Sequence, residues 1–254
     1  MLQRHPWPQT IEEAIAIQEQ LRSSVITENQ LLTVRYVAGV DVGYDSIDDV
    51  SRAAVTILSF PDLKLQQQAV VRSPTAFPYV PGFLSFREVP AVLDALENIS
   101  LRPDLILCDG QGLAHPRRFG LACHLGVLTG IATIGVAKNR FMGEHSEVGL
   151  DRGSWQPLLH EGSTVGAALR TQTGVKPIYV SIGHKVNLIS AIEYVLLCTP
   201  RYRLPETTRS ADHLTSPITG KPGRQQKMKS KKTKKTSLFG LLIFEVSPLS
   251  QKIL

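Results

Sequence analysis

The spacing of hydrophobic and polar positions changes in character along the chain. Over residues 11–34, apolar side chains recur at helical intervals with polar faces between them, which predicts an amphipathic helix packed on the rest of the protein. From residue 36 the spacing becomes that of short strands. Strand-like runs at 36–44, 51–60 and 65–73, separated by Asp, Ser and Pro turn residues, predict an antiparallel meander.

Helices and strands alternate in the following part of the chain. A helix is predicted over residues 84–100, with Pro90 early enough in it to be tolerated, and the apolar run at 104–110 predicts a buried strand. The pattern then predicts helices at 120–130 and 187–198, and strands at 131–138, 163–171 and 176–184. Three hairpin-linked strands followed by such alternation are typical of an α/β fold. We expect a mixed sheet of three antiparallel strands and then parallel strands, with helices on both faces.

Positive charge is concentrated near the C-terminus. The 254 residues have a formal net charge of +6, but residues 217–254 contain nine Lys and Arg side chains and one acid. Residues 1–216 therefore hold 19 basic and 21 acidic residues, a net charge of −2, so the basic pI is no argument for nucleic-acid binding by this part. We expect a single domain over 1–214 and a basic, low-complexity, disordered tail over 215–254.

The composition is that of an ordinary globular protein. With 43% hydrophobic and 20% charged residues, the chain can bury a large core without disulfides or a structural metal. Cys108, Cys123 and Cys198 are widely spaced in apolar runs and form no CxxC motif, which indicates core residues in a reducing compartment. No strongly apolar run approaches the roughly 20 residues of a membrane span. We expect a cytoplasmic protein with no membrane partner.

Two aspartates occupy positions where an unpaired charge would be costly. Asp41 lies inside the apolar run 36–44, and Asp109 stands near the end of the run 104–110. Either could serve a local turn, but open α/β sheets place their sites at the ends of central strands, where the two could meet. Converging carboxylates need a cation, and Mg²⁺ suits oxygen ligands. Glu88 is a candidate third ligand, or else a favourable anion near a helix N-terminus.

His115 and Lys138 follow the next two predicted strand ends. His115, six residues beyond Asp109, would fall at the same edge of the sheet and could position a water or a phosphate oxygen. Lys138 ends the run 131–138. Each alone could be a solvated loop residue, but together with the three acids they indicate a catalytic site.

The segment at residues 77–88 is unusual because prolines flank an aromatic residue. Pro78 and Pro81 fix their own φ angles and push their preceding residues, Phe77 and Val80, toward extended conformations, so that Tyr79 would sit on a stiff projection. Such a tip could stack on or wedge between bases. A turn with Tyr79 packed inward is the alternative.

Two other kinds of site find little support in the motifs. Gly110 and Gly112 follow an apolar strand as in a dinucleotide-binding fingerprint, but His115 occupies the third glycine position. The glycines could instead let the backbone approach a base or a phosphate. The histidines form no HExxH or HxxEH motif, so a zinc hydrolase is not indicated.

Taken in order, these motifs resemble the endonuclease V family, deoxyinosine-type repair endonucleases with a ribonuclease H-like fold. The resemblance covers about residues 10–214 and rests most specifically on PYVPGFLSFRE and DGQGLAHPRRFG. It also includes VAGVDVGY, IGVAKN, PIYVSIGHKV and RLPETTR. The last forty or so residues do not resemble the family.

The resemblance implies a function and a role for each candidate residue. It implies a Mg²⁺-dependent endonuclease, with Mn²⁺ able to substitute, that cuts the second phosphodiester 3′ to hypoxanthine in DNA. We expect the protein to be a monomer. By position, Asp41, Asp109 and Glu88 match the metal-binding acids, and Lys138 and His115 match residues that serve phosphate and water. The strand-separating wedge matches Pro78, Tyr79, Val80 and Pro81. The pocket for the flipped base matches Gly82, Leu84, Gly110 and Leu121.

Three functional hypotheses stay open from the sequence. The first is the inosine-directed DNA nuclease just described. The second is a nuclease of the same fold that acts on inosine-containing RNA or on branched structures. The third is a non-catalytic nucleic-acid-binding protein in which the acids are structural, which a test for Mg²⁺-dependent cleavage would distinguish.

Overall fold

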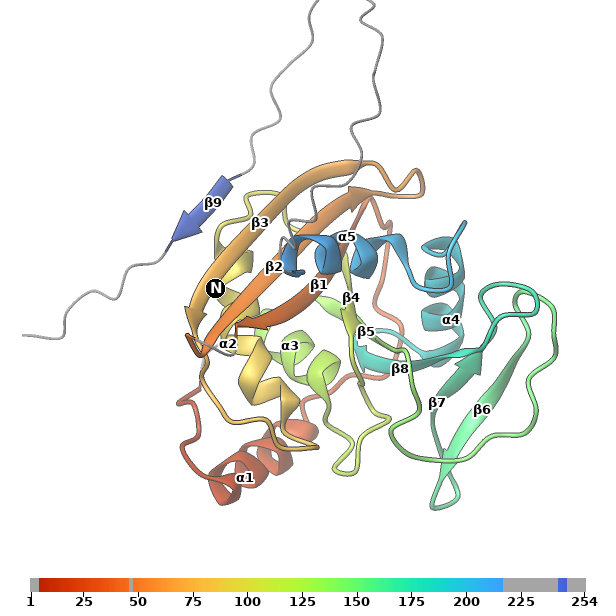
Figure 1. Cartoon of the computed structure of the whole chain (residues 1–254). Coiled ribbons are helices and arrows are strands. Elements are labelled where there is room, and N and C mark those ends of the chain that lie inside the picture. Colours follow the sequence, from red (N-terminus) through yellow and green to blue (C-terminus); the bar gives the residue numbers. More distant parts are fainter. Residues whose placement is uncertain (1–4, 46–47, 217–241, 246–254) are drawn as a thin grey trace, which may run out of the picture.

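A single mixed sheet organises the molecule in the computed structural model, which describes residues 5–45, 48–216 and 242–245 (Figure 1). The described residues form nine strands in the spatial order β6-β7-β8-β5-β4-β1-β2-β3-β9. The strands are β1 (Tyr36–Asp45), β2 (Val50–Ser59), β3 (Leu65–Pro74), β4 (Leu105–Asp109), β5 (Ala132–Ala137), β6 (Trp155–His160), β7 (Ser163–Leu169), β8 (Ile178–His184) and β9 (Leu242–Glu245). The helices are α1 (Ile11–Arg22), α2 (Leu84–Glu97), α3 (Leu121–Thr129), α4 (Leu188–Leu197) and α5 (Glu206–Thr215).

The strand directions confirm the predicted mixed sheet. β1, β2 and β3 pair antiparallel, while β1, β4 and β5 are parallel neighbours. The carboxyl ends of β1, β4 and β5 therefore meet at one edge of the sheet. Beyond β5 the strands β8, β7 and β6 are again antiparallel, so the parallel part is limited to three central strands and the pair β3–β9.

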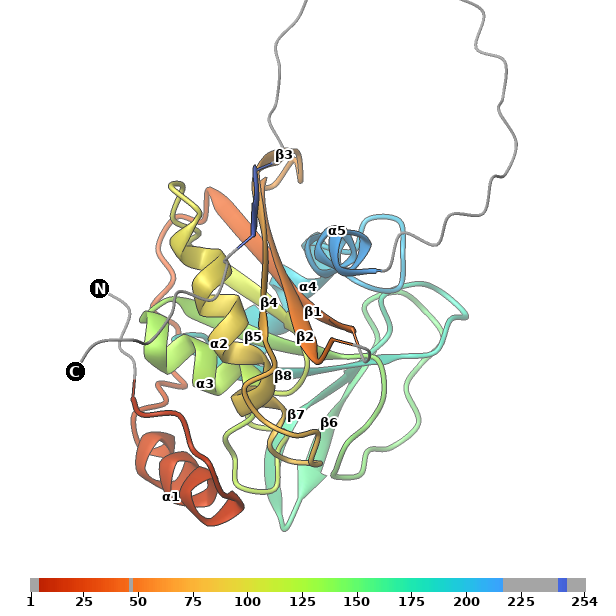
Figure 2. The same ribbon diagram turned by 60° about the vertical axis from the view of Figure 1, so that its left-hand side comes forward.

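Helices cover both faces of the sheet, as predicted (Figure 2). On one face α2 and α3 close a core around Val40, Val89 and Leu125. On the other face α4 packs over β5, β7 and β8, and α5 crosses β1 and β2. A Cβ on Gly39 would lie 2.0 Å from the carbonyl oxygen of Thr207, so only glycine lets α5 approach β1 this closely.

Two predictions about local structure were wrong, and one strand was missed. The helix predicted over 11–34 ends at Arg22. The residues that follow bond to the backbone of Lys185 instead, since the Lys185 N–H donates to the Ile26 carbonyl and the Gln30 N–H donates to the Lys185 carbonyl. Pro90 lies within α2 and beyond its first turn, where burial of the surrounding helix offsets the missing hydrogen bond. Strand β6 was not predicted, because its exposed and buried positions give no clear alternation.

The C-terminal region is described only in part. Helix α5 extends to Thr215, one residue past the predicted end of the domain, and β9 pairs in parallel with β3. The basic segment predicted to be disordered lies outside the described residues. Cys108, Cys123 and Cys198 are buried and free, as expected of core residues. Within the described part of the chain, no helix has the length and apolar character needed to cross a membrane.

Candidate active site

Asp41 and Asp109 are brought to the same level of the sheet by the pairing of β1 with β4. Val40 and Cys108 are partners in this parallel ladder, so the aspartates occupy the next position on each strand. Asp109 ends β4, as predicted, whereas β1 continues beyond Asp41 to Asp45. The structure thus places the two acids at adjacent positions on neighbouring strands.

The environment of Asp41 is unfavourable for a negative charge. Burial raises the pKa of Asp41, a hydrogen bond donated by the Thr215 hydroxyl lowers it, and the charges of Asp109 and Asp212 raise it further. The net pKa lies above the ordinary value for an aspartate. Added positive charge would therefore stabilise the ionised form of this cluster.

Glu88 approaches the aspartates from α2 on the other face of the sheet. Its side chain is 8% exposed, and Oε1 accepts a hydrogen bond of 2.9 Å from the Tyr44 hydroxyl. Burial raises the pKa of Glu88 to about 8, and the charges of Asp41 and Asp109 contribute to the increase. The predicted third acid is therefore electrostatically coupled to the other two.

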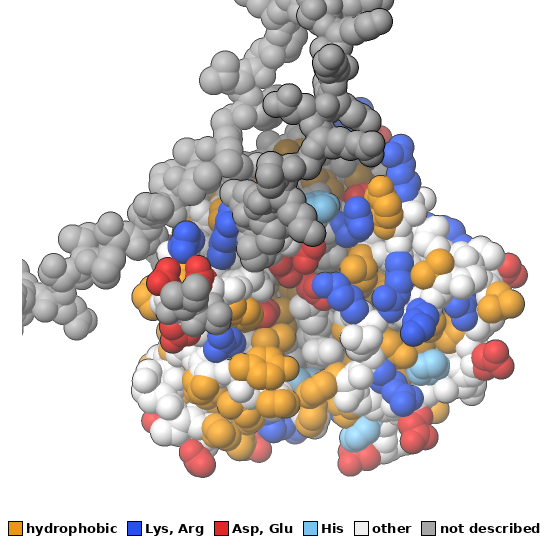
Figure 3. All heavy atoms as spheres, in the orientation of Figure 1, with side chains coloured by type: hydrophobic (Ala, Val, Ile, Leu, Met, Phe, Trp, Pro, Cys, Tyr) orange, Lys and Arg blue, Asp and Glu red, His pale blue; other side chains and the backbone are white. Residues whose placement is uncertain are grey.

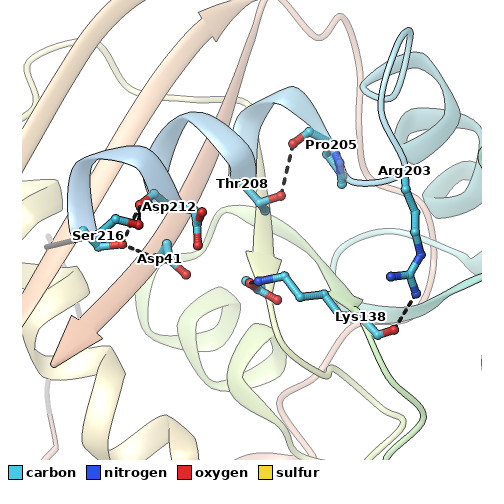
Figure 4. Close-up of polar contacts among 9 residues, drawn as sticks. Asp41, Lys138, Arg203, Pro205, Thr208, Asp212 and Ser216 are labelled. Atoms are coloured by element: carbon cyan, nitrogen blue, oxygen red, sulfur yellow. Dashed lines mark hydrogen bonds and ion pairs between the residues drawn. The ribbon is translucent and has the colours of Figure 1, made fainter. Parts of the chain in front are cut away.

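Lys138 contacts the acid cluster directly. Its Nζ lies 2.6 Å from Oδ2 of Asp109, and its backbone carbonyl accepts a hydrogen bond of 2.6 Å from Arg203 (Figure 4). Burial alone would lower the pKa of Lys138, but the hydrogen bond and charge of Asp109 raise it above its ordinary value. The residue after β5 is thus held as a cation beside the acids.

Asp212 is a member of this cluster that the sequence analysis missed. It lies on α5, whose close-up in Figure 4 shows it facing Asp41 and Lys138, and its charge raises the pKa of both. The signal for it is the spacing Gly39, Asp41, Gly43. Since alternate residues share a face of a strand, two glycines flanking an acid indicate that a helix crosses closely over that acid.

The donor set of the cluster suits a hard divalent cation. Asp41, Glu88, Asp109 and Asp212 offer only carboxylate oxygens, the ligands that Mg²⁺ prefers. Among residues 5–45, 48–216 and 242–245, no three His, Cys, Asp or Glu side chains already stand in an arrangement that could hold a metal ion. Protein partners contact three of the acids: Thr215 on Asp41, Tyr44 on Glu88, and Lys138 on Asp109.

A cavity of about 190 Å³ lies next to the acids. It brings together three of the predicted wedge residues and most of the predicted base pocket, together with residues that were not predicted. Its lining consists of Tyr79, Val80, Pro81, Gly82, Leu84, Ser85, Gln111, His115, Gly120, Leu121 and Phe141. Two elements connect it to the acids, since Asp109 leads into Gln111 and Ser85 lies one helical turn before Glu88.

His115 is part of the wall of this cavity. Its Nε2 is 2.9 Å from the carbonyl oxygen of Gly82, and its ring stacks on Phe141 with 6.0 Å between centroids. Burial lowers the pKa of His115 to about 4, so the ring is neutral near pH 7. A neutral ring with Nε2 protonated donates to Gly82, which is a structural role in the cavity wall.

Two glycines shape the cavity in different ways. Gly82 has φ +85°, a conformation that favours glycine, and its carbonyl is turned toward His115. Gly110 does not line the cavity itself, but a Cβ on it would lie 3.1 Å from Cδ2 of Leu121, which does. Gly110 therefore controls the cavity through the position of Leu121.

The wedge segment projects outward as predicted. Tyr79 is 70% exposed, while Phe77 and Phe83 on either side of the wedge are buried in one cluster with Ala14 and Phe86. The aromatic tip is thus anchored at both ends and free at its centre. An inward-packed Tyr79, the alternative from the sequence, is excluded.

One face of the molecule has separated charges. Figure 3 shows acidic side chains near its centre, Lys and Arg side chains on the side of α4, α5 and β8, and an apolar region toward α1. A polyanion could contact the basic side of this face.

Two aspartates side by side on the parallel central strands β1 and β4, in a mixed sheet covered by helices on both faces, are typical of nucleases of the ribonuclease H-like class. The sequence profile of the Endonuclease V family matches residues 19–213. The chain belongs to the endonuclease V family, whose members are hydrolytic enzymes that cut nucleic acids.

Relatives and solved structures agree with this assignment. The chain is 63% identical over 215 residues to Endonuclease V of Trichormus variabilis, covering 84% of this chain and 97% of that protein. The crystal structure of the Streptomyces avermitilis Endonuclease V is 51% identical, with a TM-score of 0.80 over 84% of this chain and 94% of that one. Ciona intestinalis Endonuclease V, in complex with a 24mer DNA containing an inosine followed by a ribo-adenosine, is 31% identical, with a TM-score of 0.72 over 81% and 95%.

Proposed function

We propose that the protein is a Mg²⁺-dependent DNA repair endonuclease that recognises hypoxanthine and hydrolyses the second phosphodiester bond 3′ to it, leaving 3′-hydroxyl and 5′-phosphate ends. The observation that carries the proposal is the connection of a carboxylate cluster to a base-sized cavity with an exposed aromatic tip at its rim. The inosine-containing DNA bound by the Ciona intestinalis relative supports the choice of substrate. Three free buried cysteines suit the reducing cytoplasm, where we expect a monomer.

Asp41, Asp109 and Glu88 are the proposed ligands of Mg²⁺, with Asp212 as a further acid and Mn²⁺ as a substitute ion. When bound, a divalent cation polarises the scissile phosphate and lowers the pKa of the attacking water. The protein's own contribution is to hold these carboxylates close together despite their mutual repulsion. Helix α5 brings Asp212 to the cluster by crossing β1, and the buried helix α2 brings Glu88.

Lys138 supplies positive charge where the phosphate charge increases during hydrolysis. Its raised pKa keeps it cationic, and its contact with Asp109 holds it beside the acids. A fixed cation of this kind stabilises the transition state more than the ground state. We assign His115 to the cavity wall, where it holds Gly82.

Base discrimination is assigned to the cavity. Hypoxanthine has a carbonyl where adenine has an amino group, and an N1 donor where adenine has an acceptor. Fixed polar backbone groups that pair with hypoxanthine would be left without hydrogen-bond partners by adenine. Such unpaired groups are a strong source of selectivity. Leu84, Leu121 and Phe141 supply apolar contacts for the ring.

The substrate class is tested by comparing one inosine in duplex DNA, one inosine in RNA and a branched DNA without inosine, each in Mg²⁺ and in a chelator. We expect the inosine-containing DNA to be cut fastest, and only with the metal. Faster cleavage of inosine-containing RNA would make the protein an RNA-directed nuclease. Binding without cleavage of any substrate would favour a non-catalytic role.

Tyr79→Ala should weaken binding to inosine duplex DNA by about 1–3 kcal/mol, the usual contribution of one aromatic stack on a base. The reason is that the exposed ring is the part of the wedge free to stack between separated bases. Affinities for duplex and single-stranded inosine substrates should be measured side by side. The single strand needs less separation and should lose less affinity; equal losses would mean that Tyr79 is not a wedge.

A chain ending at Ser216 should keep its preference for inosine over adenine while its affinity for undamaged DNA falls. Residues 217–237 carry eight basic groups beside a body of net charge −2, so they should add salt-sensitive attraction to phosphates without selectivity. The end is placed after Ser216 to retain Thr215, which donates to Asp41. Binding to plain duplex at several salt concentrations measures the effect, and an unchanged salt slope would show that the tail does not contact DNA.

A further inference from the structure

Helix α1 carries a fully buried glutamine that no part of the proposed reaction uses. Gln18 is 0% exposed, although the rest of α1 is largely accessible apart from Ala14. A buried carboxamide is costly unless its two N–H groups and its oxygen are all hydrogen-bonded. Its partners therefore show what the helix holds in place.

The partners of Gln18 lie on two different walls of the base cavity. Its Nε2 donates to the carbonyl oxygen of Gly82 at 3.1 Å and to that of Phe119 at 3.3 Å. Gly82 lines the cavity from the wedge side, and Phe119 directly precedes Gly120, which lines it from the loop between β4 and α3. One side chain thus joins walls that are 37 positions apart in the sequence.

Arg117 completes the connection. Its Nε donates to Oε1 of Gln18, its Nη2 donates to the Gly82 carbonyl at 2.9 Å, and its guanidinium lies over the Phe83 ring, 4.4 Å from the centroid. All polar atoms of the Gln18 side chain are therefore engaged, and the amide is fixed in one orientation. Figure 1 shows α1 beneath the segment that leads into α2.

We propose that Gln18 is a positioning residue for base recognition, which sets the separation of the two cavity walls by joining Gly82 to Phe119. This inference rests on the proposed function of the cavity. A planar base fits only between walls held at the right separation, and selectivity depends on fixed polar groups. Gln18 acts through these walls and does not itself line the cavity.

The test uses Gln18→Met in the full-length protein, because methionine keeps the volume and removes the polar atoms. For cleavage of an inosine duplex we expect KM to rise about tenfold, the equivalent of one or two lost hydrogen bonds, with kcat nearly unchanged. The preference for inosine over adenine should fall by a similar factor. Arg117→Lys, which cannot supply the Nε donor, should shift KM in the same direction by about threefold and serves if the first variant does not fold.

The matched control is Ala16→Gly, an exposed substitution in the middle of α1 that weakens the helix without touching either wall. It should lower the melting temperature while KM and the inosine preference stay at the parental values. Equal changes of KM in Gln18→Met and Ala16→Gly at matched loss of melting temperature would overturn the inference, as would unchanged selectivity in Gln18→Met. Failure of the parental protein to prefer inosine would refute the proposed function instead.

Discussion

Asp109→Asn should reduce Mg²⁺-dependent cleavage of an inosine duplex by about a thousandfold or more, which corresponds to a loss of about 4 kcal/mol of transition-state stabilisation. Asparagine keeps the shape of the side chain but removes the charge that holds Lys138 and that we propose binds the cation. Asp41→Asn should have a similar effect because Asp41 occupies the adjacent position in the parallel ladder. Single-turnover cleavage rates measure the loss directly.

Binding to the same duplex should survive these substitutions, since phosphate contacts and base contacts elsewhere persist. The control is Asp62→Asn, which changes the same chemical group on an exposed side chain paired with Lys64. That variant should cleave at the parental rate. Parental cleavage by Asp109→Asn in Mg²⁺ would show that the carboxylate cluster is not the catalytic site.

Gly110→Val should reduce inosine cleavage by about a hundredfold, at the upper end of what overpacking of a buried contact costs. A side chain at this position would meet Leu121 at 3.1 Å from its first carbon, and Leu121 would move toward the space meant for the base. Circular dichroism should show that the variant is folded. Cleavage and binding of inosine and adenine duplexes then separate a blocked cavity from a general loss of activity.

A second substitution sharpens this prediction. Adding Leu121→Ala to Gly110→Val removes the side chain that the valine displaces, so inosine cleavage should recover in part. Selective cleavage retained by Gly110→Val alone would mean that the base binds elsewhere.

The sequence predicted the parts of the site in which a local pattern is unusual. Asp41 and Asp109 stood out because a charge inside an apolar strand is costly, and parallel pairing of β1 with β4 then placed them side by side. Tyr79 stood out because flanking prolines limit its backbone, and the structure places it outward. These patterns involve only neighbouring residues in the sequence, so the sequence alone was enough to detect them.

Other parts of the site depend on tertiary packing. Asp212 joins the acids only because α5 crosses β1, and nothing in the helix itself indicates that crossing. The role of His115 was predicted from its distance along the chain after Asp109, and its hydrogen bond with the Gly82 carbonyl could not be predicted from that distance. Gln18 lies in an ordinary amphipathic helix pattern. Its positioning role is apparent only from its hydrogen bonds to two carbonyl groups that are distant in the sequence.

The most direct test of the whole account is the cleavage of an end-labelled DNA duplex that contains a single inosine, with the cut mapped to the nucleotide. We predict one cut, at the second phosphodiester 3′ to the inosine, in the presence of Mg²⁺ and not in a chelator. The duplex with adenine in place of inosine should stay intact under the same conditions. Equal cutting of both duplexes, or no metal-dependent cut in the inosine strand, would contradict the account.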